Sequence, residues 1–214
     1  MRGRTDRTDR GQTFTLEAFV AAILLLAAVA FAMQVVAVSS NTADQADIEV
    51  GAQHTGLAQG VLDQSADNGT LQSTLVYWDE NGSAFHGADD LDEGFYIGRA
   101  PPTIFGNKTA EMFDDRQDRY NIDLYYTNTT ENGNQTRERQ RLVEMGTPSD
   151  DAVRVTQTVV LYNDTTLVDE NRSATDVTLA DVTDDETAAF YAPDANPDSP
   201  VYNVVRVEVV LWRT

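Results

Sequence analysis

The feature that most constrains this chain is an apolar run near its N-terminus, from Ala18 to Val38, interrupted only by Gln34. As an α-helix the run would be about 31 Å long at roughly 1.5 Å per residue, which matches the hydrocarbon thickness of a bilayer. A helix that is apolar on every face at the end of a chain is typical of a membrane span rather than of a buried core helix. The sequence therefore predicts a transmembrane helix over residues 12–38, with residues 18–38 in the membrane.

The flank before this run indicates an orientation. Residues 1–11 are polar and carry four arginines against two aspartates. Because positively charged flanks stay on the cytoplasmic side, this basic leader places the N-terminus inside the cell and the rest of the chain outside. The segment Ala30-Phe31-Ala32 has the small-x-small form of a signal-peptidase site, so a removed secretory signal is an alternative to a retained anchor. A soluble protein with a buried N-terminal helix is the third interpretation.

A carboxylate stands at the edge of the apolar run. Glu17 follows Gly11, Gln12 and two threonines. Its charge is costly if it faces lipid, so it favours a function or a partner, although contact with lipid headgroups would also accommodate it.

The basic segment, Gly11, Gln12, Glu17 and the apolar run together resemble the class III signal of type IV pilins and pseudopilins, over residues 7–38. The resemblance implies a peptidase that cuts after Gly11 or Gln12 and a retained helix that packs with other pilin-like subunits. It also implies that Glu17 pairs with the new terminal amine. Cleavage after Gly11 leaves Glu17 sixth in the mature chain, whereas the family prefers the fifth place, which cleavage after Gln12 restores.

The charge excludes several classes of protein. The formal net charge is −20, from 35 acidic and 15 basic side chains, and such a surface repels the phosphates of nucleic acids. Lys108 is the only lysine, and high acidity with little lysine resembles proteins of salt-loving archaea; an ordinary acidic protein is the alternative. Because the chain has no cysteine, it has no disulfide, no thiolate-bound metal and no thiol nucleophile.

After the apolar run the helical pattern becomes amphipathic. Small and apolar residues recur at spacings of three, four and seven, at Ala43, Ala46, Val50, Leu57 and Val61. Asn68-Gly69 is a stop signal. The pattern predicts an amphipathic helix or stalk over residues 39–67, followed by an extracytoplasmic β-rich domain over residues 68–214.

Strand signals dominate the second half. Strands are predicted at 71–78, 84–86, 120–126, 153–161 and 202–212. The last is apolar on both faces, which is typical of a central strand, whereas the polar segments 127–140 and 181–200 are predicted to be loops. The predicted fold class is α+β, with a long N-terminal helix, transmembrane and then amphipathic, packed on an antiparallel β-sheet domain.

The sequon N-x-[ST] is frequent. It begins at Asn68, Asn81, Asn107, Asn128, Asn134, Asn163 and Asn171. Chance would give about two in a chain of this composition, so the excess predicts glycosylation at some of these sites and hence an extracytoplasmic domain. The alternative is that Asn, Gly and Thr simply occur together in loops.

Acidic clusters and histidines give little support to metal binding or catalysis. Asp63, Ser65 and Asp67 have the spacing that opens an EF-hand loop, but the glycine and the closing glutamate are missing. The clusters 89–93 and 114–118 are predicted to be solvated acidic surface. His54 falls in the predicted stalk, and no catalytic motif surrounds His86, although Asp89 or Asp90 could join it in a relay. No cofactor, metal or catalytic residue is predicted, and the chain is not expected to be an enzyme.

These observations predict a structural, pilin-like (minor pilin or pseudopilin) subunit of an archaeal cell-surface filament or secretion assembly, crossing the cell membrane once. The alternative is a single-pass envelope protein whose outer domain binds a ligand or sugar without forming a filament. A secreted domain released after Ala32 is the third hypothesis.

Overall fold

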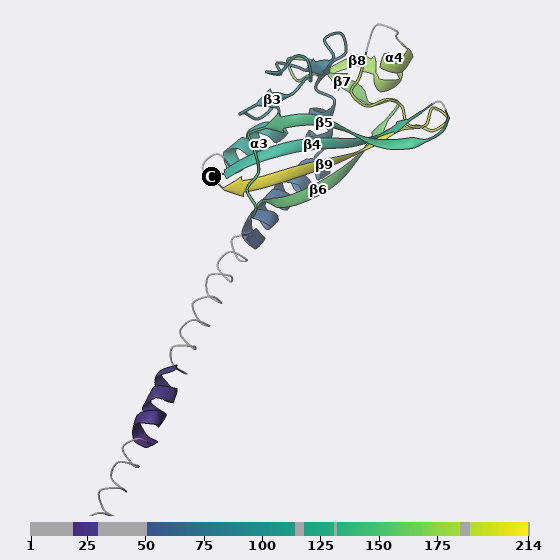
Figure 1. Cartoon of the computed structure of the whole chain (residues 1–214). Helices are drawn as coiled ribbons and strands as arrows, with labels where there is room; N and C mark the ends of the chain where they lie inside the picture. Colours follow the sequence, from purple (N-terminus) through teal and green to yellow (C-terminus); the bar gives the residue numbers. More distant parts are fainter. Residues whose placement is uncertain (1–18, 30–50, 114–117, 131, 185–188, 214) are drawn as a thin grey trace, which may run out of the picture. The chain divides into compact units, whose positions relative to one another are not determined.

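The structure is a computed structural model that describes residues 19–29, 51–113, 118–130, 132–184 and 189–213. The chain divides into two compact units, Met1–Val50 and Gly51–Thr214. In the first unit, residues 19–29 form a helix. The second unit contains all the strands of the described structure and the remaining helices (Figure 1).

The second unit is built on a five-stranded sheet. Its strands, in spatial order, are β3 (Tyr96–Ile97), β5 (Gln135–Glu144), β4 (Asp118–Thr129), β9 (Val201–Arg213) and β6 (Val153–Tyr162). Neighbouring strands are antiparallel except β3 and β5, which are parallel. Strand β9 lies between β4 and β6 and is therefore an interior strand, as its apolar character on both faces predicts.

Smaller elements surround this sheet. Two hairpins, each a two-stranded antiparallel sheet, consist of β1 (Trp78–Asp79) with β2 (Ala84–Phe85) and β7 (Thr166–Val168) with β8 (Ala174–Thr178). The short helices are α2 (Thr70–Leu75), α3 (Ile104–Phe113) and α4 (Leu179–Asp184). A further helical segment, residues 51–67, precedes α2.

The core lies on one face of the sheet. Side chains of β4 alternate along the strand, so that Ile122 and Leu124 are fully buried while the residues between them are not. The helical segment 51–67 lies on this face (Figure 1), and Ala58 and Leu62 join the same core cluster as the strand residues. A helix with one apolar stripe is stabilised by burying that stripe against a half-apolar sheet.

Local chemistry sets two element boundaries. Gly69 adopts φ +75°, the left-handed conformation that glycine accommodates without strain, and it separates the helical segment 51–67 from α2, as the Asn68-Gly69 signal predicts. In α3, a Cβ on Gly106 would lie 2.0 Å from the carbonyl oxygen of Pro101. Glycine is therefore required where α3 begins, because any side chain there would collide with the preceding loop.

The predicted fold class is wrong. Within the described residues there is no long N-terminal helix packed on the sheet: the helical residues 19–29 and 51–67 belong to different units, and residues 30–50 lie outside the described parts. The other helices are short, more of the described residues lie in strands than in helices, and the sheet is mixed rather than antiparallel. The helical periodicity of the sequence correctly predicted that residues 19–29 and 51–67 are helical. It could not predict how many residues a single helix would contain.

Two local predictions also need correction. Of the strand predicted at 71–78 only Trp78 is in a strand, where β1 pairs with β2 as the predicted hairpin requires; Thr70–Leu75 is helical and buries Leu71, Thr74 and Leu75 at helical spacing. The segment 127–140 is not a loop but the end of β4, a tight turn and most of β5. The polar residues 135–140 form a strand because β5 pairs with β4 across eight register positions, and this pairing stabilises a strand whose first five side chains are all exposed. The predicted strands at 120–126 and 153–161 are confirmed.

Candidate functional site

The predicted processing and assembly residues fall outside the described structure. Gly11, Gln12 and Glu17 precede residue 19, so their prediction stays untested. The described part of the predicted span, residues 19–29, is helical and its apolar side chains are exposed. Within the described residues no helix is both long and apolar enough to cross a membrane.

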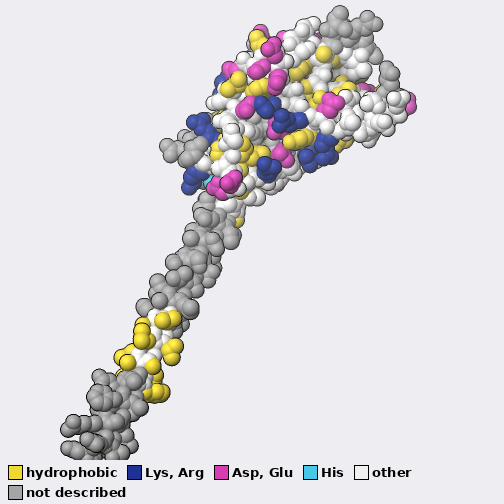
Figure 2. Space-filling view, viewed as in Figure 1, with side chains coloured by type: hydrophobic (Ala, Val, Ile, Leu, Met, Phe, Trp, Pro, Cys, Tyr) yellow, Lys and Arg dark blue, Asp and Glu magenta, His cyan; other side chains and the backbone are white. Residues whose placement is uncertain are grey.

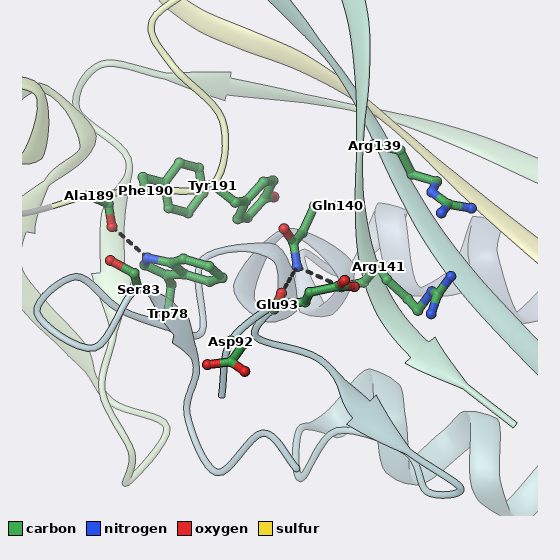
Figure 3. A pocket seen from close by; sticks show the side chains of 10 residues that line it. All are labelled: Trp78, Ser83, Asp92, Glu93, Arg139, Gln140, Arg141, Ala189, Phe190 and Tyr191. Atoms are coloured by element: carbon green, nitrogen blue, oxygen red, sulfur yellow. Dashed lines mark hydrogen bonds between the residues drawn. The ribbon is translucent and has the colours of Figure 1, made fainter. Parts of the chain in front are cut away.

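A pocket of about 460 Å³ opens beside the part of β5 that does not pair with β3 (Figure 3). Three segments far apart in the sequence line it, namely residues 78–93 around the β1–β2 hairpin, residues 139–141 of β5 and residues 189–191 before β9. Aromatic side chains form its floor, and polar side chains form its rim. This combination, in a pocket of this volume, is one that small-ligand sites use.

The aromatic floor is closely packed. The indole Nε1–H of Trp78 donates to the carbonyl oxygen of Ala189 at 2.6 Å, and its ring meets Tyr191 at 5.4 Å between ring centroids. The ring centroids of Phe190 and Tyr191 lie 4.2 Å apart. Trp78 is 3% and Tyr191 9% exposed, so neither ring offers an open face on which a sugar could stack.

The polar rim is also engaged. The side-chain amide of Gln140 donates to the carbonyl oxygens of Glu93, at 2.7 Å, and of Arg141, at 2.9 Å. Figure 3 shows Arg139 and Arg141 pointing away from the aromatic floor. Arg139 pairs with Asp123 at 3.7 Å, and Arg141 pairs with Glu144. The polar groups of the pocket are therefore already used within the fold, where Gln140 links β5 to the loop before β3 through a hydrogen bond.

Tyrosine hydroxyls close to this floor stay protonated. Burial, and then the neighbouring Glu138 carboxylate, raise the pKa of Tyr126 to about 12. Burial raises the pKa of Tyr191 well above its usual range. A phenol with a raised pKa is a poor general base at neutral pH, so these groups act in packing rather than in proton transfer.

The two histidines lie in different environments. His54, on the helical segment 51–67, is buried with its Nε2 3.5 Å from a carboxylate oxygen of the buried Asp118, which begins β4. Arg213, at the end of β9, lies 3.6 Å from the other oxygen of Asp118. This cluster ties a helix and two strands together. Among the described residues no group of three or more His, Asp or Glu side chains is arranged to hold a metal ion.

The hypothetical relay at His86 does not form. Asp89 accepts from the Arg99 Nε–H at 2.8 Å and from the Ile97 backbone N–H at 3.0 Å. The ring of His86 packs instead against Tyr77, with 5.0 Å between centroids. Asp89 therefore fixes the loop before β3 rather than orienting an imidazole.

Five of the seven sequon asparagines are exposed. Asn81 lies in the β1–β2 turn, Asn134 in the β4–β5 turn and Asn171 in the β7–β8 turn. Asn107 is exposed on α3. Asn68 is exposed after the helical segment 51–67, and its side-chain oxygen accepts from the hydroxyl of Thr70 at 2.6 Å and from the Thr70 backbone N–H at 3.0 Å.

The two other sequon asparagines are half-buried and use their amides in the fold. The Nδ2 of Asn128 donates to a carboxylate oxygen of Glu138 at 2.7 Å. The Nδ2 of Asn163 donates to the carbonyl oxygen of Ser199 at 3.1 Å. Glycosylation replaces one of the two hydrogens on this nitrogen with a bulky sugar, which is harder to accommodate at a half-buried amide that already donates to the fold, so the exposed sites are the better acceptors.

Sequence reasoning missed the side of the sheet opposite the core. Six arginines point to this face. Each one either alternates along its strand with core-facing residues or is paired, on the neighbouring strand, with a residue that alternates in this way. They are at positions 119, 137, 139, 141, 154 and 206. The signal was the arginine at every second position from Arg137 to Arg141, but it lies in a segment that was predicted to be a loop.

One family model matches nearly the whole chain. It is described as a family of unknown function, DUF7288, and it matches residues 10–211. No curated protein and no solved structure matches the chain.

Proposed function

The chain belongs to the DUF7288 family, and on that premise we propose that it is a pilin-like structural subunit of an archaeal cell-surface filament or secretion assembly. The N-terminal apolar segment anchors the subunit in the membrane and packs with the same segment of other subunits. The unit from Gly51 onward faces outside.

The observation that carries this proposal is the exposure of apolar side chains on the helix at residues 19–29. Phe19, Leu24, Leu25 and Leu26 are each more than 60% exposed, and Val20, Ile23 and Val29 about half. These positions surround the helix instead of forming one stripe. Such a helix is stable only where lipid or other apolar helices cover it on every side.

The extent of the family match supports the same proposal. The matched range begins at residue 10, so it includes Gly11, Gln12, Glu17 and the whole apolar run, and it leaves most of the basic leader out. A family defined over both the signal-like segment and the outer domain is expected where the two act together.

Glu17 gives the proposal a mechanism that separates it from a plain anchor. In a plain anchor, Glu17 lies at the headgroups and is hydrated. In a pilin-like assembly it is drawn into a helix bundle beside the amine that leader removal creates. An unpaired charge within a membrane costs at least about 2.5 kcal/mol, whereas a paired one is tolerated.

The test compares variants of the full chain expressed in its native membrane. Glu17→Gln should leave processing and membrane insertion intact but prevent recovery of high-molecular-weight complexes, whereas the matched control Glu49→Gln, outside the apolar run, should assemble normally. Gly11→Val should leave a longer, unassembled form. The measurements are the mass of the mature N-terminus and the size of detergent-extracted complexes.

The alternative makes a different prediction. If the wild-type protein keeps residues 1–11 and never enters a larger complex, the pilin-like proposal fails and a single-pass envelope protein replaces it. The packed floor and engaged rim of the pocket beside β5 do not favour sugar binding as the role of such a protein.

A further inference from the structure

The outer face of the five-stranded sheet, opposite the helical segment 51–67, carries a charge that differs from the rest of the protein. Residues 51–214 contain 29 acidic and 11 basic side chains. Six of these basic residues point to this face, which we call the arginine face: Arg119, Arg137, Arg139, Arg141, Arg154 and Arg206. Figure 2 shows the dark-blue side chains gathered over the sheet.

Register places these arginines on one side. Tyr125 pairs with Arg139 on β5 and with Arg206 on β9, and paired residues share a face. Arg154 of β6 pairs with Val210, which follows the core-facing Val209 and so points outward. The face therefore extends across four strands from β5 to the edge strand β6.

The carboxylates on this face are too few to neutralise it. Three acidic residues share the face, and two of them are taken by Arg139 and Arg141. The third, Glu208, accepts from the hydroxyl of Tyr125 at 3.5 Å. Within the described parts of the chain, Arg119, Arg137 and Arg154 have no carboxylate within ion-pair distance.

Arg206 is held in place without an anionic partner of its own. Its guanidinium lies over the ring of Tyr125 at 4.8 Å, and its Nε is buried with no hydrogen-bond acceptor. A guanidinium fixed by stacking retains a fork of N–H donors that matches a carboxylate. The face is thus organised for oxyanions that the same copy of the domain does not supply.

We propose that the arginine face binds the acidic surface of a second copy of this chain. The inference rests on the proposed function, since it names how the outer domains meet in the assembly. Copies with a net charge of −20 repel each other unless one contact surface carries the opposite sign, and within the described residues the arginine face carries it.

The sequons support a protein partner at this face. None of the seven sequon asparagines occupies an outward position on the strands of the sheet. Asn128 in β4 lies on the opposite side from the neighbouring Thr127–Arg137 pair, and the other six lie outside the five strands. Glycans on the exposed turns would therefore leave the arginine face uncovered. A contact through this face would not be blocked by modification.

The charge pattern also sets the symmetry of the contact. Two arginine faces repel each other, so the contact joins the arginine face of one copy to a different, acidic surface of the next. Such a heterologous contact is head-to-tail and leaves the pair with one free arginine face and one free acidic surface. Repetition of this contact builds a ring or a filament rather than a closed dimer.

The experiment measures association between two differently tagged copies of the full-length protein in detergent. Arg137→Glu/Arg154→Glu reverses two exposed charges of the face without touching the core. Lys108→Glu/Arg172→Glu is the matched control, with the same change in charge away from the face. We expect the first pair to weaken self-association about tenfold and the control less than about twofold. An unchanged melting temperature shows that both variants are folded.

Mixing wild-type and variant copies tests the head-to-tail geometry. A variant copy still offers its acidic surface to the arginine face of a wild-type copy, so mixed pairs should form. Because a bound variant cannot extend the chain through its own altered face, an excess of variant should shorten the chains that wild-type copies build. If mixed pairs are lost as fully as pairs of two variants, the contact is not head-to-tail and the proposal is overturned.

Anionic competitors test the identity of the partner. Inorganic polyphosphate and vesicles of anionic lipid should compete weakly with a second copy. If the wild-type protein binds either one more tightly than its own copies, in a manner that depends on Arg137 and Arg154, the partner is a phosphate-bearing polymer or membrane and the proposal fails.

The outcome is separable from that of the pilin-like function. If residues 1–11 are retained but association still depends on the arginine face, the pilin-like function fails and this contact stands. If the leader is removed and complexes that depend on Glu17 form equally in Arg137→Glu/Arg154→Glu, the function stands and this contact is wrong.

Discussion

Leucine side chains have opposite environments in the two units of this chain. Leu24, Leu25 and Leu26 in the first unit are 65%, 67% and 70% exposed, whereas Leu62 and Leu124 in the second are fully buried. The second unit buries its apolar side chains between a sheet and the helices on it. In the first unit the described helix, residues 19–29, leaves its apolar side chains exposed, and in the proposed function lipid or other subunits cover them.

The largest effect expected from this difference concerns removal of the first unit. A chain that begins at Gly51 should leave the membrane fraction completely and still unfold cooperatively, because its core is self-contained. The measurements are cell fractionation and thermal unfolding. If the shortened chain stays in the membrane fraction, or lacks a cooperative transition, the two units are not independent in this way.

A matched pair of leucine substitutions sharpens the comparison. Leu124→Ala should lower the free energy of unfolding by about 2–5 kcal/mol, because it leaves a cavity among fully buried side chains. Leu25→Ala should leave the unfolding of the outer domain unchanged, since Leu25 lies in the other unit. Chemical denaturation of both variants measures this. Equal losses at the two positions would contradict the division of the chain.

The pH dependence of stability tests how far the core of the second unit excludes water from the Tyr126 hydroxyl. In the folded protein the pKa of Tyr126 is raised to about 12, while an unfolded tyrosine titrates near pH 10. Between these values the unfolded chain loses a proton that the folded chain keeps, so stability is full below pH 10 and falls as the pH rises to 12. The loss is at most about 3 kcal/mol. Tyr126→Phe should reduce the fall in stability across this pH range without abolishing it, because the pKa of the buried Tyr191 is also raised. An unaltered curve would show that Tyr126 does not contribute to it.

The smallest effect concerns modification of the outer unit. Asn134→Gln, at an exposed turn, should lower the mass of the native protein by one glycan and leave its stability unchanged. Asn163→Gln should leave the mass unchanged but cost about 1 kcal/mol, because the amide bonded to Ser199 is displaced. The intact mass and the melting temperature of each variant measure these two effects. A native mass equal to that of the bare chain would end the glycosylation hypothesis for every site.

The sequence determined those elements whose pattern is local. Strict alternation from Tyr120 to Tyr126 gave β4, and apolar residues on both faces of 202–212 gave an interior strand, because burial on two sides requires it. The Asn68-Gly69 stop is likewise local, since it depends only on the left-handed conformation of one glycine.

Tertiary structure decided what depends on pairing. Residues 70–75 are helical and 135–144 form a strand because of what they pack against or pair with, and neither partner can be recognised from a window of the sequence. The parallel pair of β3 with β5, the tied amides of Asn128 and Asn163, and the gathering of six arginines on one face have the same origin. Side chains far apart in the chain acquire a shared surface only when strand register aligns them, and register is a property of the whole sheet.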